Sequence, residues 1–274
     1  MKTCSKDEIE NYNDLLPYSI EACTLNGIIY AVPQLLCTNL LYTRKGETQF
    51  NNMYDIYHAI NVTDLTSRDS RDKGIFINSI TGKTSLLCWY LETLIDMNGE
   101  YMDIFPPLTE NLDLTENKAF KTLQMLRNIA YEKTVNSENL FKNGIGSAFI
   151  GYSEAMYNLG TDFEFNLFSL SSGDNIPVFY ADIAGVNSNI SKEKRLLAIE
   201  LLNVITSKEV LIKAVASQYL LVARNSVYDF LAKSDPVYQK LKNIVTISNS
   251  HIFTIRPSAR TFLKNAKPII EKLQ

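Results

Sequence analysis

The segment Asn26-Gly-Ile-Ile-Tyr-Ala-Val-Pro-Gln-Leu-Leu-Cys-Thr-Asn-Leu-Leu-Tyr-Thr-Arg-Lys45 decides the fold. Asn26-Gly27 predicts a tight turn, because this dipeptide tolerates the positive φ angles of short hairpin turns. Residues 28–32 are an apolar run that predicts a strand, ended by Pro33, which has no N–H to donate to a ladder. Residues 35–42 are a second apolar run and predict another short strand.

Outward from this segment, apolar runs and helical patterns alternate, which predicts an α/β fold. The spacing of apolar residues predicts helices over 52–59, 86–97, 117–132, 192–206 and 208–217, and near 226–232, 236–245 and 258–273. Apolar runs predict strands over 147–152, 163–169, 177–185 and 219–222.

Composition excludes several classes of protein. The chain has 274 residues, 46% apolar and 21% charged, which is typical of one large or two modest globular domains rather than of a disordered chain. A net charge of −3 with no basic stripe argues against nucleic-acid binding. No run approaches the roughly 20 apolar residues of a membrane span. Residues 1–10 are polar, so no signal peptide is expected within this chain.

Cysteine and histidine patterns do not indicate a metal site. The cysteines are irregularly spaced without a C-x-x-C pair, which argues against a disulfide framework, zinc binding and redox chemistry. The two histidines are too few and too far apart for a histidine-based metal site, so we expect neither a metal nor a cofactor. These residues are Cys4, Cys23, Cys37, Cys88, His58 and His251.

Cys37 is the candidate nucleophile. It lies between apolar Leu36 and polar Thr38-Asn39, where the chain crosses from one element to another. A single cysteine on an apolar strand can equally be a small buried hydrophobic residue. A nucleophile needs a base within hydrogen-bond reach, and neither histidine stands in a context that recommends it, so a carboxylate would have to serve.

Two tripeptides, Tyr152-Ser153-Glu154 and Tyr180-Ala181-Asp182, supply such carboxylates at the ends of apolar strands. Since residues i and i+2 of a strand share a face, each tripeptide presents a phenol and an acid on one side if its strand continues that far. This pattern suits an aromatic ring with basic nitrogens, because the tyrosine stacks and the acid hydrogen-bonds. The alternative is a strand-end tyrosine beside an exposed acid.

These residues carry a family resemblance. Residues 26–33 and 38–45 resemble the interlobe crossover of bacterial extracellular solute-binding proteins, and residues 219–224 resemble their later crossover. Within that superfamily, residues 33–39 (Pro-Gln-Leu-Leu-Cys-Thr-Asn) resemble the active-site segment of thiaminase I, or thiamine pyridinylase. The resemblance covers nearly the whole chain.

The resemblance implies a role for each candidate residue. Cys37 would be the nucleophile and Glu154 the catalytic glutamate. Asp182 would bind the pyrimidine, and Tyr152 and Tyr180 would stack on it or frame it.

The resemblance also implies the architecture. It indicates a two-lobed, type II periplasmic-binding-protein-like fold, with the first lobe incomplete at the N-terminus because full members have a substantial stretch before the first crossover. Residues 1–30 and 174–218 would be the remnant of lobe one. Residues 31–173 and 219–274 would form lobe two with the C-terminal helices.

The implied activity is a transfer reaction that displaces the thiazole of thiamine by another base through a covalent cysteine–pyrimidine adduct. The partners would be small molecules only, thiamine and an organic base or thiol, and the protein would be a monomer in the extracellular or periplasmic space. A non-catalytic solute-binding protein for thiamine or a related pyrimidine is the alternative. A cysteine hydrolase is a weaker one, since the sequence offers no recognisable histidine partner.

Overall fold

Two compact units make up the protein. The computed structural model describes residues 4–47, 49–60, 74–77, 83–98, 118–131, 137–170, 176–247, 250–252 and 271. Unit 1 comprises residues 1–38 and 177–253, and unit 2 comprises residues 39–176 and 254–274. Within the described residues, the chain passes from one unit to the other at Thr38–Asn39 and at Ile176–Pro177.

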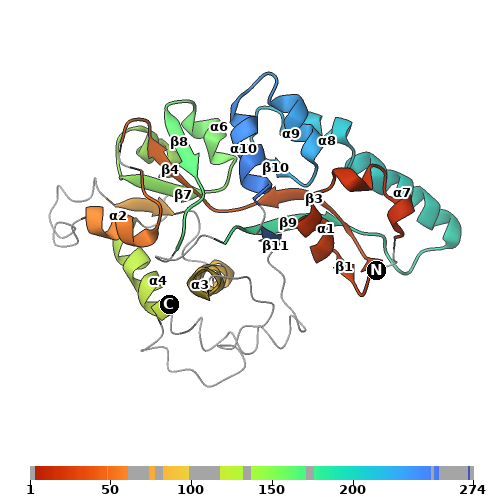
Figure 1. The fold of residues 1–274 in the computed structure, drawn as a ribbon, viewed down its shortest axis with the longest axis horizontal. Coiled ribbons are helices and arrows are strands. Elements are labelled where there is room, and N and C mark those ends of the chain that lie inside the picture. The colour runs from red at the N-terminus through yellow and green to blue at the C-terminus, as the bar shows by residue number, and fades with distance from the viewer. Residues whose placement is uncertain are drawn as a thin grey trace. The chain divides into compact units, whose positions relative to one another are not determined.

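Unit 1 is built on a four-stranded sheet in the order β10-β3-β9-β11, with β3 antiparallel to both of its neighbours (Figure 1). The strands of this sheet are β3 (Val32–Cys37), β9 (Val178–Ala184), β10 (Leu221–Val222) and β11 (His251–Ile252). A separate two-stranded sheet of unit 1 consists of β1 (Thr24–Leu25) and β2 (Ile28–Ile29). Its helices are α1 (Pro17–Ala22), α7 (Lys192–Ile205), α8 (Lys208–Val215), α9 (Asn225–Leu231) and α10 (Val237–Val245).

The predicted turn at Asn26-Gly27 is confirmed. These residues join β1 to β2 with φ angles of 51° and 75°, both in the left-handed region that Asn and Gly tolerate best.

The predicted strand end at Pro33 is wrong, because β3 runs through this proline to Cys37. Only Leu35 and Leu36 of β3 pair with β10, so Pro33 lies where β3 has a partner on one side. The register with β9 also shifts between Pro33 and Leu35. A proline is tolerated at an irregularity of this kind, since no ladder bond there requires its missing N–H.

Unit 2 contains a five-stranded sheet in the order β6-β5-β7-β4-β8, in which β4 is antiparallel to β7 and β8 while β5, β6 and β7 are parallel. Its strands are β4 (Leu40–Arg44), β5 (Ile75–Ile77), β6 (Ala130–Tyr131), β7 (Ala148–Gly151) and β8 (Phe163–Asn166). Its helices are α2 (Met53–Ala59), α3 (Lys83–Asn98), α4 (Lys118–Ile129), α5 (Ser137–Lys142) and α6 (Ala155–Leu159).

The α/β class is confirmed, and most predicted helices agree with observed ones to within a few residues. The helix predicted over 117–132 is α4, whose buried residues Leu123, Leu126 and Ile129 recur at helical spacing. The helix predicted over 258–273 lies outside the described residues, apart from position 271.

The observed units differ from the expected lobes near both ends of the chain. Residues 31–38 and 219–253 were expected in lobe two, whereas both segments belong to unit 1. The physical reason is pairing, because Leu221 and Val222 of β10 lie opposite Leu36 and Leu35 of β3.

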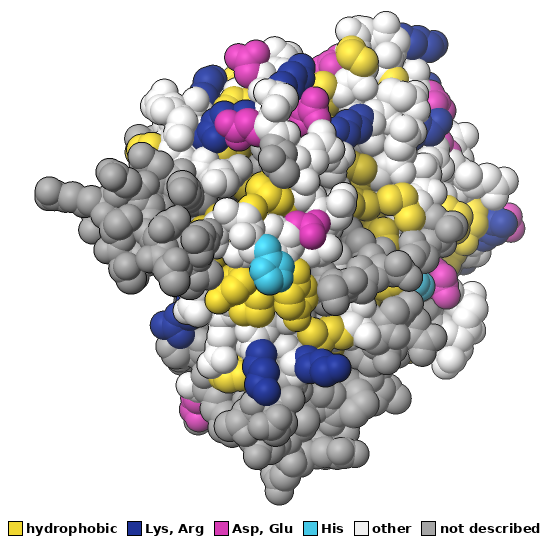
Figure 2. Space-filling view, turned by 60° about the vertical axis from the view of Figure 1, so that its left-hand side comes forward, with side chains coloured by type: hydrophobic (Ala, Val, Ile, Leu, Met, Phe, Trp, Pro, Cys, Tyr) yellow, Lys and Arg dark blue, Asp and Glu magenta, His cyan; other side chains and the backbone are white. Residues whose placement is uncertain are grey.

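The surface carries both signs of charge. Figure 2 shows basic and acidic side chains interspersed with apolar ones on the face it presents. In the part of the chain that the structure describes, no helix is both long enough and apolar enough to cross a bilayer.

Candidate active site

Cys37 differs in exposure from two of the other cysteines. Cys4 and Cys23 have 5% and 8% of their surface exposed, whereas Cys37 and Cys88 are half-buried, and none of the four forms a disulfide. Burial raises the pKa of the Cys23 thiol to about 11, so that thiol stays protonated at neutral pH. Cys37 therefore retains the solvent access that a reactive thiol requires.

Cys37 is the last residue of β3 and lies directly opposite Tyr180 of β9. Asp182, two residues further along β9, lies opposite Leu35. Directly opposed residues of an antiparallel pair point to the same face of the sheet, as do residues i and i+2 of one strand. Cys37, Tyr180 and Asp182 therefore share one face of the unit-1 sheet, with Tyr180 half-buried and Asp182 exposed.

The backbone around this face is held by its neighbours. The hydroxyl of the buried Thr38 donates to the carbonyl of Val178 at 2.8 Å, which ties the ends of β3 and β9 together. Phe179 is fully buried, and its ring stacks on Tyr18 of α1 with 5.4 Å between centroids. The alternation of β9 thus buries Phe179 on one face and leaves Tyr180 and Asp182 for the other.

Tyr152 and Glu154 do not lie on a strand, so alternation does not place their side chains on one face. β7 ends at Gly151, and the next residues form a turn in which the Ala155 N–H donates to the Tyr152 carbonyl at 3.1 Å. Glu154 is the N-cap of α6, with helical φ and ψ angles of −66° and −18°. The expectation of a continued strand is therefore wrong for this tripeptide.

The half-buried carboxyl of Glu154 has a raised pKa. Burial is the largest cause, and the negative charge of Glu138 adds to it, while a hydrogen bond from the backbone of Glu154 opposes it. A carboxylate with a raised pKa is a stronger base than an exposed one, which suits a group that must accept a proton near neutral pH.

Tyr42, on β4, is a supporting residue that had no predicted role. Its hydroxyl donates to the Tyr152 carbonyl at 2.7 Å from a fully buried side chain whose ring lies against Phe149 and Phe165. Tyr42 thus holds the start of the turn that contains Glu154. A phenol at the end of the apolar run Leu40-Leu41-Tyr42 is the sequence signal that could have identified it, since a buried tyrosine hydroxyl requires a partner.

Arg44, also on β4, supports the loop before β7. Its guanidinium donates to the carbonyls of Phe141 at 2.6 Å and Gly146 at 2.9 Å, and lies 4.5 Å from the centre of the Phe141 ring. This arginine therefore fixes the backbone that leads into β7 and on to Tyr152.

The five predicted site residues fall into two sets, each within one unit. Cys37, Tyr180 and Asp182 belong to unit 1, whereas Tyr152 and Glu154 belong to unit 2. Among the described residues, no group of three or more His, Cys, Asp and Glu side chains is arranged to hold a metal ion.

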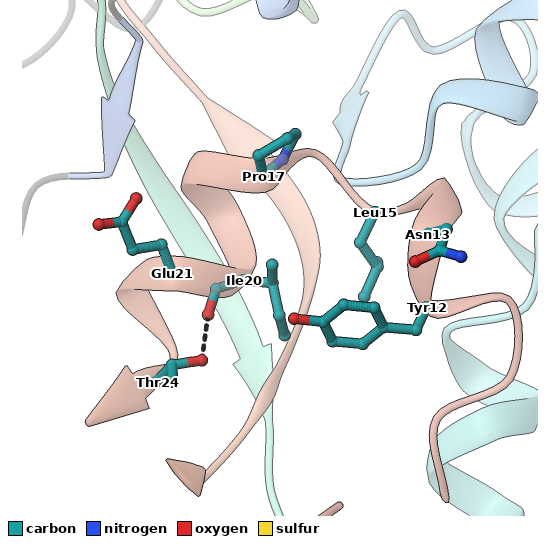
Figure 3. Close-up of a pocket in the computed structure, with 7 residues that line it drawn as sticks. All are labelled: Tyr12, Asn13, Leu15, Pro17, Ile20, Glu21 and Thr24. Carbon is teal, nitrogen blue, oxygen red and sulfur yellow. Dashed lines mark hydrogen bonds between the residues drawn. The ribbon is translucent and has the colours of Figure 1, made fainter. Parts of the chain in front are cut away.

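A cavity of about 420 Å³ lies beside α1 in unit 1, away from these residues in the sequence. Figure 3 shows the Tyr12 phenol pointing toward Ile20, and the Thr24 hydroxyl bonded to the Ile20 carbonyl. The lining is mixed apolar and polar and contains none of the five predicted site residues; it consists of Tyr12, Asn13, Leu15, Pro17, Ile20, Glu21 and Thr24.

Comparison with known proteins gives close similarities. Residues 38–171 match the Thiaminase-1 domain family. Thiaminase-1 of Paenibacillus thiaminolyticus is 36% identical over an alignment of 289 positions, which covers 96% of this chain and 69% of that protein. These similarities include the segment from Asn39 to Glu154.

Solved structures agree with the sequence comparison. Clostridium botulinum thiaminase I in complex with thiamin superposes with a TM-score of 0.89 at 38% identity, and thiaminase I from Bacillus thiaminolyticus with 0.88 at 33%. Each match covers all of this chain and 81% of that chain. A maltose-bound MalE3 from T. maritima is only 16% identical, with a TM-score of 0.70, and supports the two-lobed type II binding-protein fold alone.

Proposed function

The chain belongs to the thiaminase I family, and on that premise we propose that it exchanges the thiazole of thiamine for another base through a covalent adduct on Cys37. The observation that carries the proposal is the shared face of Cys37, Tyr180 and Asp182 on the β3–β9 ladder. A thiol, a phenol and an acid beside one another suit an aminopyrimidine ring that must be held and attacked.

Covalent addition solves the chemical difficulty of this reaction. The methylene that joins the two rings of thiamine is displaced slowly, because the pyrimidine does not expel the thiazole unaided. The Cys37 thiolate adds to the pyrimidine carbon next to a ring nitrogen, and the electrons of this adduct then break the bond from methylene to thiazole. The incoming base adds to the methylene, and the carbon–sulfur bond breaks to return the thiolate.

Glu154 moves the protons in this scheme. A free thiol has a pKa near 8.5, so only a few per cent is thiolate at neutral pH and a base must accept its proton. Glu154 takes that proton and, after releasing it to solvent, takes another from the incoming base. The raised pKa of Glu154 supports this role.

Asp182 and the two tyrosines bind the ring. Asp182 hydrogen-bonds the aminopyrimidine and keeps a proton on a ring nitrogen, which stabilises the negative charge that develops as the thiolate adds. Tyr180 stacks on the ring from the same face, and Tyr152 frames it.

We further propose an extracellular or periplasmic location, a monomeric state, and a pyridine, an aniline or a thiol as the acceptor. The resemblance to extracellular solute-binding proteins supports the location. Cell fractionation tests the location, and size-exclusion chromatography tests the monomeric state. Analysis of the products formed with a pyridine, an aniline and a thiol tests which of them is the acceptor.

Mass spectrometry after incubation with thiamine tests the covalent proposal. We expect a mass increase equal to the pyrimidine-methylene group, located on the peptide that contains Cys37. Cys37→Ser should form no adduct and lose base exchange by on the order of 10⁴-fold or more, as expected for loss of a nucleophile. Cys88→Ser is the matched control, because Cys88 is also a half-buried thiol.

Two outcomes would contradict the proposal. Bound thiamine without an adduct or turnover indicates a solute-binding protein of the same fold. Undiminished base exchange by Cys37→Ser shows that another group attacks.

A further inference from the structure

Two buried acids lie one turn apart on α3. Glu92 and Asp96 have 9% and 5% of their surface exposed, and a spacing of four residues places them on the same side of the helix. Carboxylates are costly to bury unless specific donors compensate them, so the donors indicate what these acids hold.

Glu92 holds the residue at which the chain first enters unit 2. The side-chain amide of Asn39 donates to its two carboxylate oxygens at 3.1 and 3.4 Å. Asn39 is the first residue of unit 2 and follows Cys37 by two positions.

Asp96 holds the residue at which the chain leaves unit 2. One carboxylate oxygen accepts from the Ile176 N–H at 3.1 Å, and Ile176 directly precedes Pro177, where unit 1 resumes. The other oxygen accepts from the Leu170 N–H at 2.8 Å and the Ser169 hydroxyl at 3.0 Å. Burial raises the pKa of Asp96 to about 6, although the hydrogen bonds from these three donors oppose the rise. At neutral pH the carboxyl group is therefore ionised, and it accepts hydrogen bonds but donates none.

The same two passages are joined on the unit-1 side. The Thr38 hydroxyl donates to the Val178 carbonyl at 2.8 Å, and the next residues of the ladder pair Cys37 with Tyr180. Each passage therefore leads within four residues from an acid-held position in unit 2 to a residue of the proposed reaction, Cys37 in one case and Tyr180 in the other.

We propose that Glu92 and Asp96 are positioning residues for base exchange, which fix the unit-2 ends of both passages from one face of α3 and thereby hold the backbone that carries Cys37 and Tyr180. This proposal rests on the proposed function. Neither acid touches the substrate in this scheme. Their effect is on the geometry of attack, where a displacement of about 1 Å can reduce the rate of a reaction by about 100-fold.

Conservative and truncating variants of the acids test the proposal, with three readouts: kcat and KM for base exchange, the unfolding midpoint, and amide-resolved hydrogen exchange without substrate. Glu92→Ala removes the acceptor for Asn39 and is expected to lower kcat about tenfold or more, with KM changed less than about threefold. Glu92→Gln retains an oxygen that accepts from Asn39 and should restore most of kcat.

Asp96→Asn is expected to lower kcat in the same way. An asparagine has an NH₂ group in place of one carboxylate oxygen, and this NH₂ group would face the N–H or hydroxyl donors that now bond to that oxygen, so those hydrogen bonds would be lost. The amides of Leu170 and Ile176 should then exchange faster. Thr93→Ala is the matched control, since Thr93 is fully buried on α3 and, among the described residues, its hydroxyl bonds only to the Trp89 carbonyl of the same helix at 2.7 Å. It should change stability without changing kcat.

Other outcomes separate the possibilities. If Glu92→Ala and Asp96→Asn lower the unfolding midpoint as Thr93→Ala does and leave kcat unchanged, the acids only stabilise the fold and the proposal is overturned. If Glu92→Gln fails to restore kcat, the proposal is also overturned for that acid. If the wild-type protein exchanges no base, the proposed function fails. If amide hydrogen exchange is also unchanged in the variants, the two acids do not hold the ends of the passages either.

Discussion

The pattern tyrosine, any residue, acid occurs twice with different local structures. Tyr180 and Asp182 lie within β9, where alternation sets their common face, whereas Tyr152 and Glu154 follow the end of β7 in a turn into α6. Each tripeptide follows an apolar run, so the runs do not distinguish them. The difference comes from the neighbouring strands.

A strand continues only as far as it has a partner. β9 has β3 beside it from Val32 to Cys37, so its ladder covers Tyr180 to Ala184. β7 pairs with β4, which begins at Leu40, and Leu40 lies opposite Gly151. Beyond Gly151, β7 has no residue of β4 to pair with, because Thr38 and Asn39 form the passage between units.

This difference assigns different constraints to the two acids. The ladder sets the direction of Asp182, while Glu154 depends on a turn held by the Ala155 N–H and the Tyr42 hydroxyl, both of which donate to the Tyr152 carbonyl. We therefore expect binding to depend mainly on the ladder and proton transfer mainly on the turn.

Glu154→Gln should give the largest effect of the variants that test this comparison. Since an amide cannot accept a proton, base exchange should fall by about 10²–10⁴-fold, mainly in kcat. Steady-state kinetics measures the change. If kcat is undiminished at neutral pH, proton transfer does not depend on the turn.

The pH dependence of the wild-type rate sharpens this test. Glu154 accepts a proton only when ionised, so the rate should rise with pH through its pKa, and burial places that pKa above the ordinary value of 4.5. Glu138→Gln is the control, because it removes a negative charge that contributes to raising the pKa of Glu154. It should move the acid limb to lower pH while the maximal rate is retained.

Asp182→Asn should give a smaller effect of a different kind. Hydrogen bonds to charged groups contribute about 1.5–3 kcal/mol, so we expect kcat/KM to fall by roughly 10–100-fold, largely through KM. Asp229→Asn is the control in the same unit, because Asp229 is exposed and pairs with Lys242. A loss confined to kcat would show instead that Asp182 acts in the chemical step.

Local patterns explain what could be predicted from the sequence. The Asn26-Gly27 turn and the helices depend on residues close together in the chain, and the face of Tyr180 and Asp182 follows from alternation alone. The prediction failed at Pro33 and after Gly151, where the extent of a strand depends on a partner far away in the sequence.

Polar contacts between residues far apart in the sequence also could not be predicted from it. Arg224 is 2% exposed and donates to the carbonyls of Glu10 at 2.8 Å and Asn11 at 2.9 Å, and to that of Thr206. It joins segments separated by as many as 214 positions. No periodicity within residues 219–224 indicates such partners. The hydrogen bond from the Ile176 N–H to Asp96 joins residues 80 positions apart and likewise has no local sequence signal.

Gly151→Ala tests whether the end of β7 also requires a small residue. A Cβ at this position would overlap the ring of Phe149, which is 2% exposed and cannot move freely. Overpacking of this kind costs about 1–3 kcal/mol, measured as a fall in the free energy of unfolding.

Ser153→Ala, two residues further on, is the counterpart. The Ser153 hydroxyl is buried, and the described residues provide it with no hydrogen-bond partner, so its loss should be neutral or stabilising. If both variants lose equal stability, the turn is sensitive as a whole and the Gly151–Phe149 contact is not the cause.

Tyr42→Phe should give a small loss and separates the turn from its support. It removes the 2.7 Å bond to the Tyr152 carbonyl and keeps the ring against Phe149 and Phe165, so the free energy of unfolding should fall by about 1 kcal/mol. The Tyr152 carbonyl still accepts from the Ala155 N–H, which limits the loss.

The kinetic result then decides which contact holds the turn. If Tyr42 contributes, kcat should fall a few-fold and the Ala155 amide should exchange faster, whereas Tyr12→Phe, a change at a half-buried tyrosine of unit 1, should alter neither. An unchanged kcat in Tyr42→Phe would mean that the Ala155 hydrogen bond alone keeps Glu154 in place. The turn would then need no support from β4. The two acids would differ in local structure, a turn for Glu154 and a strand for Asp182, but the position of Glu154 would not depend on the neighbouring strand.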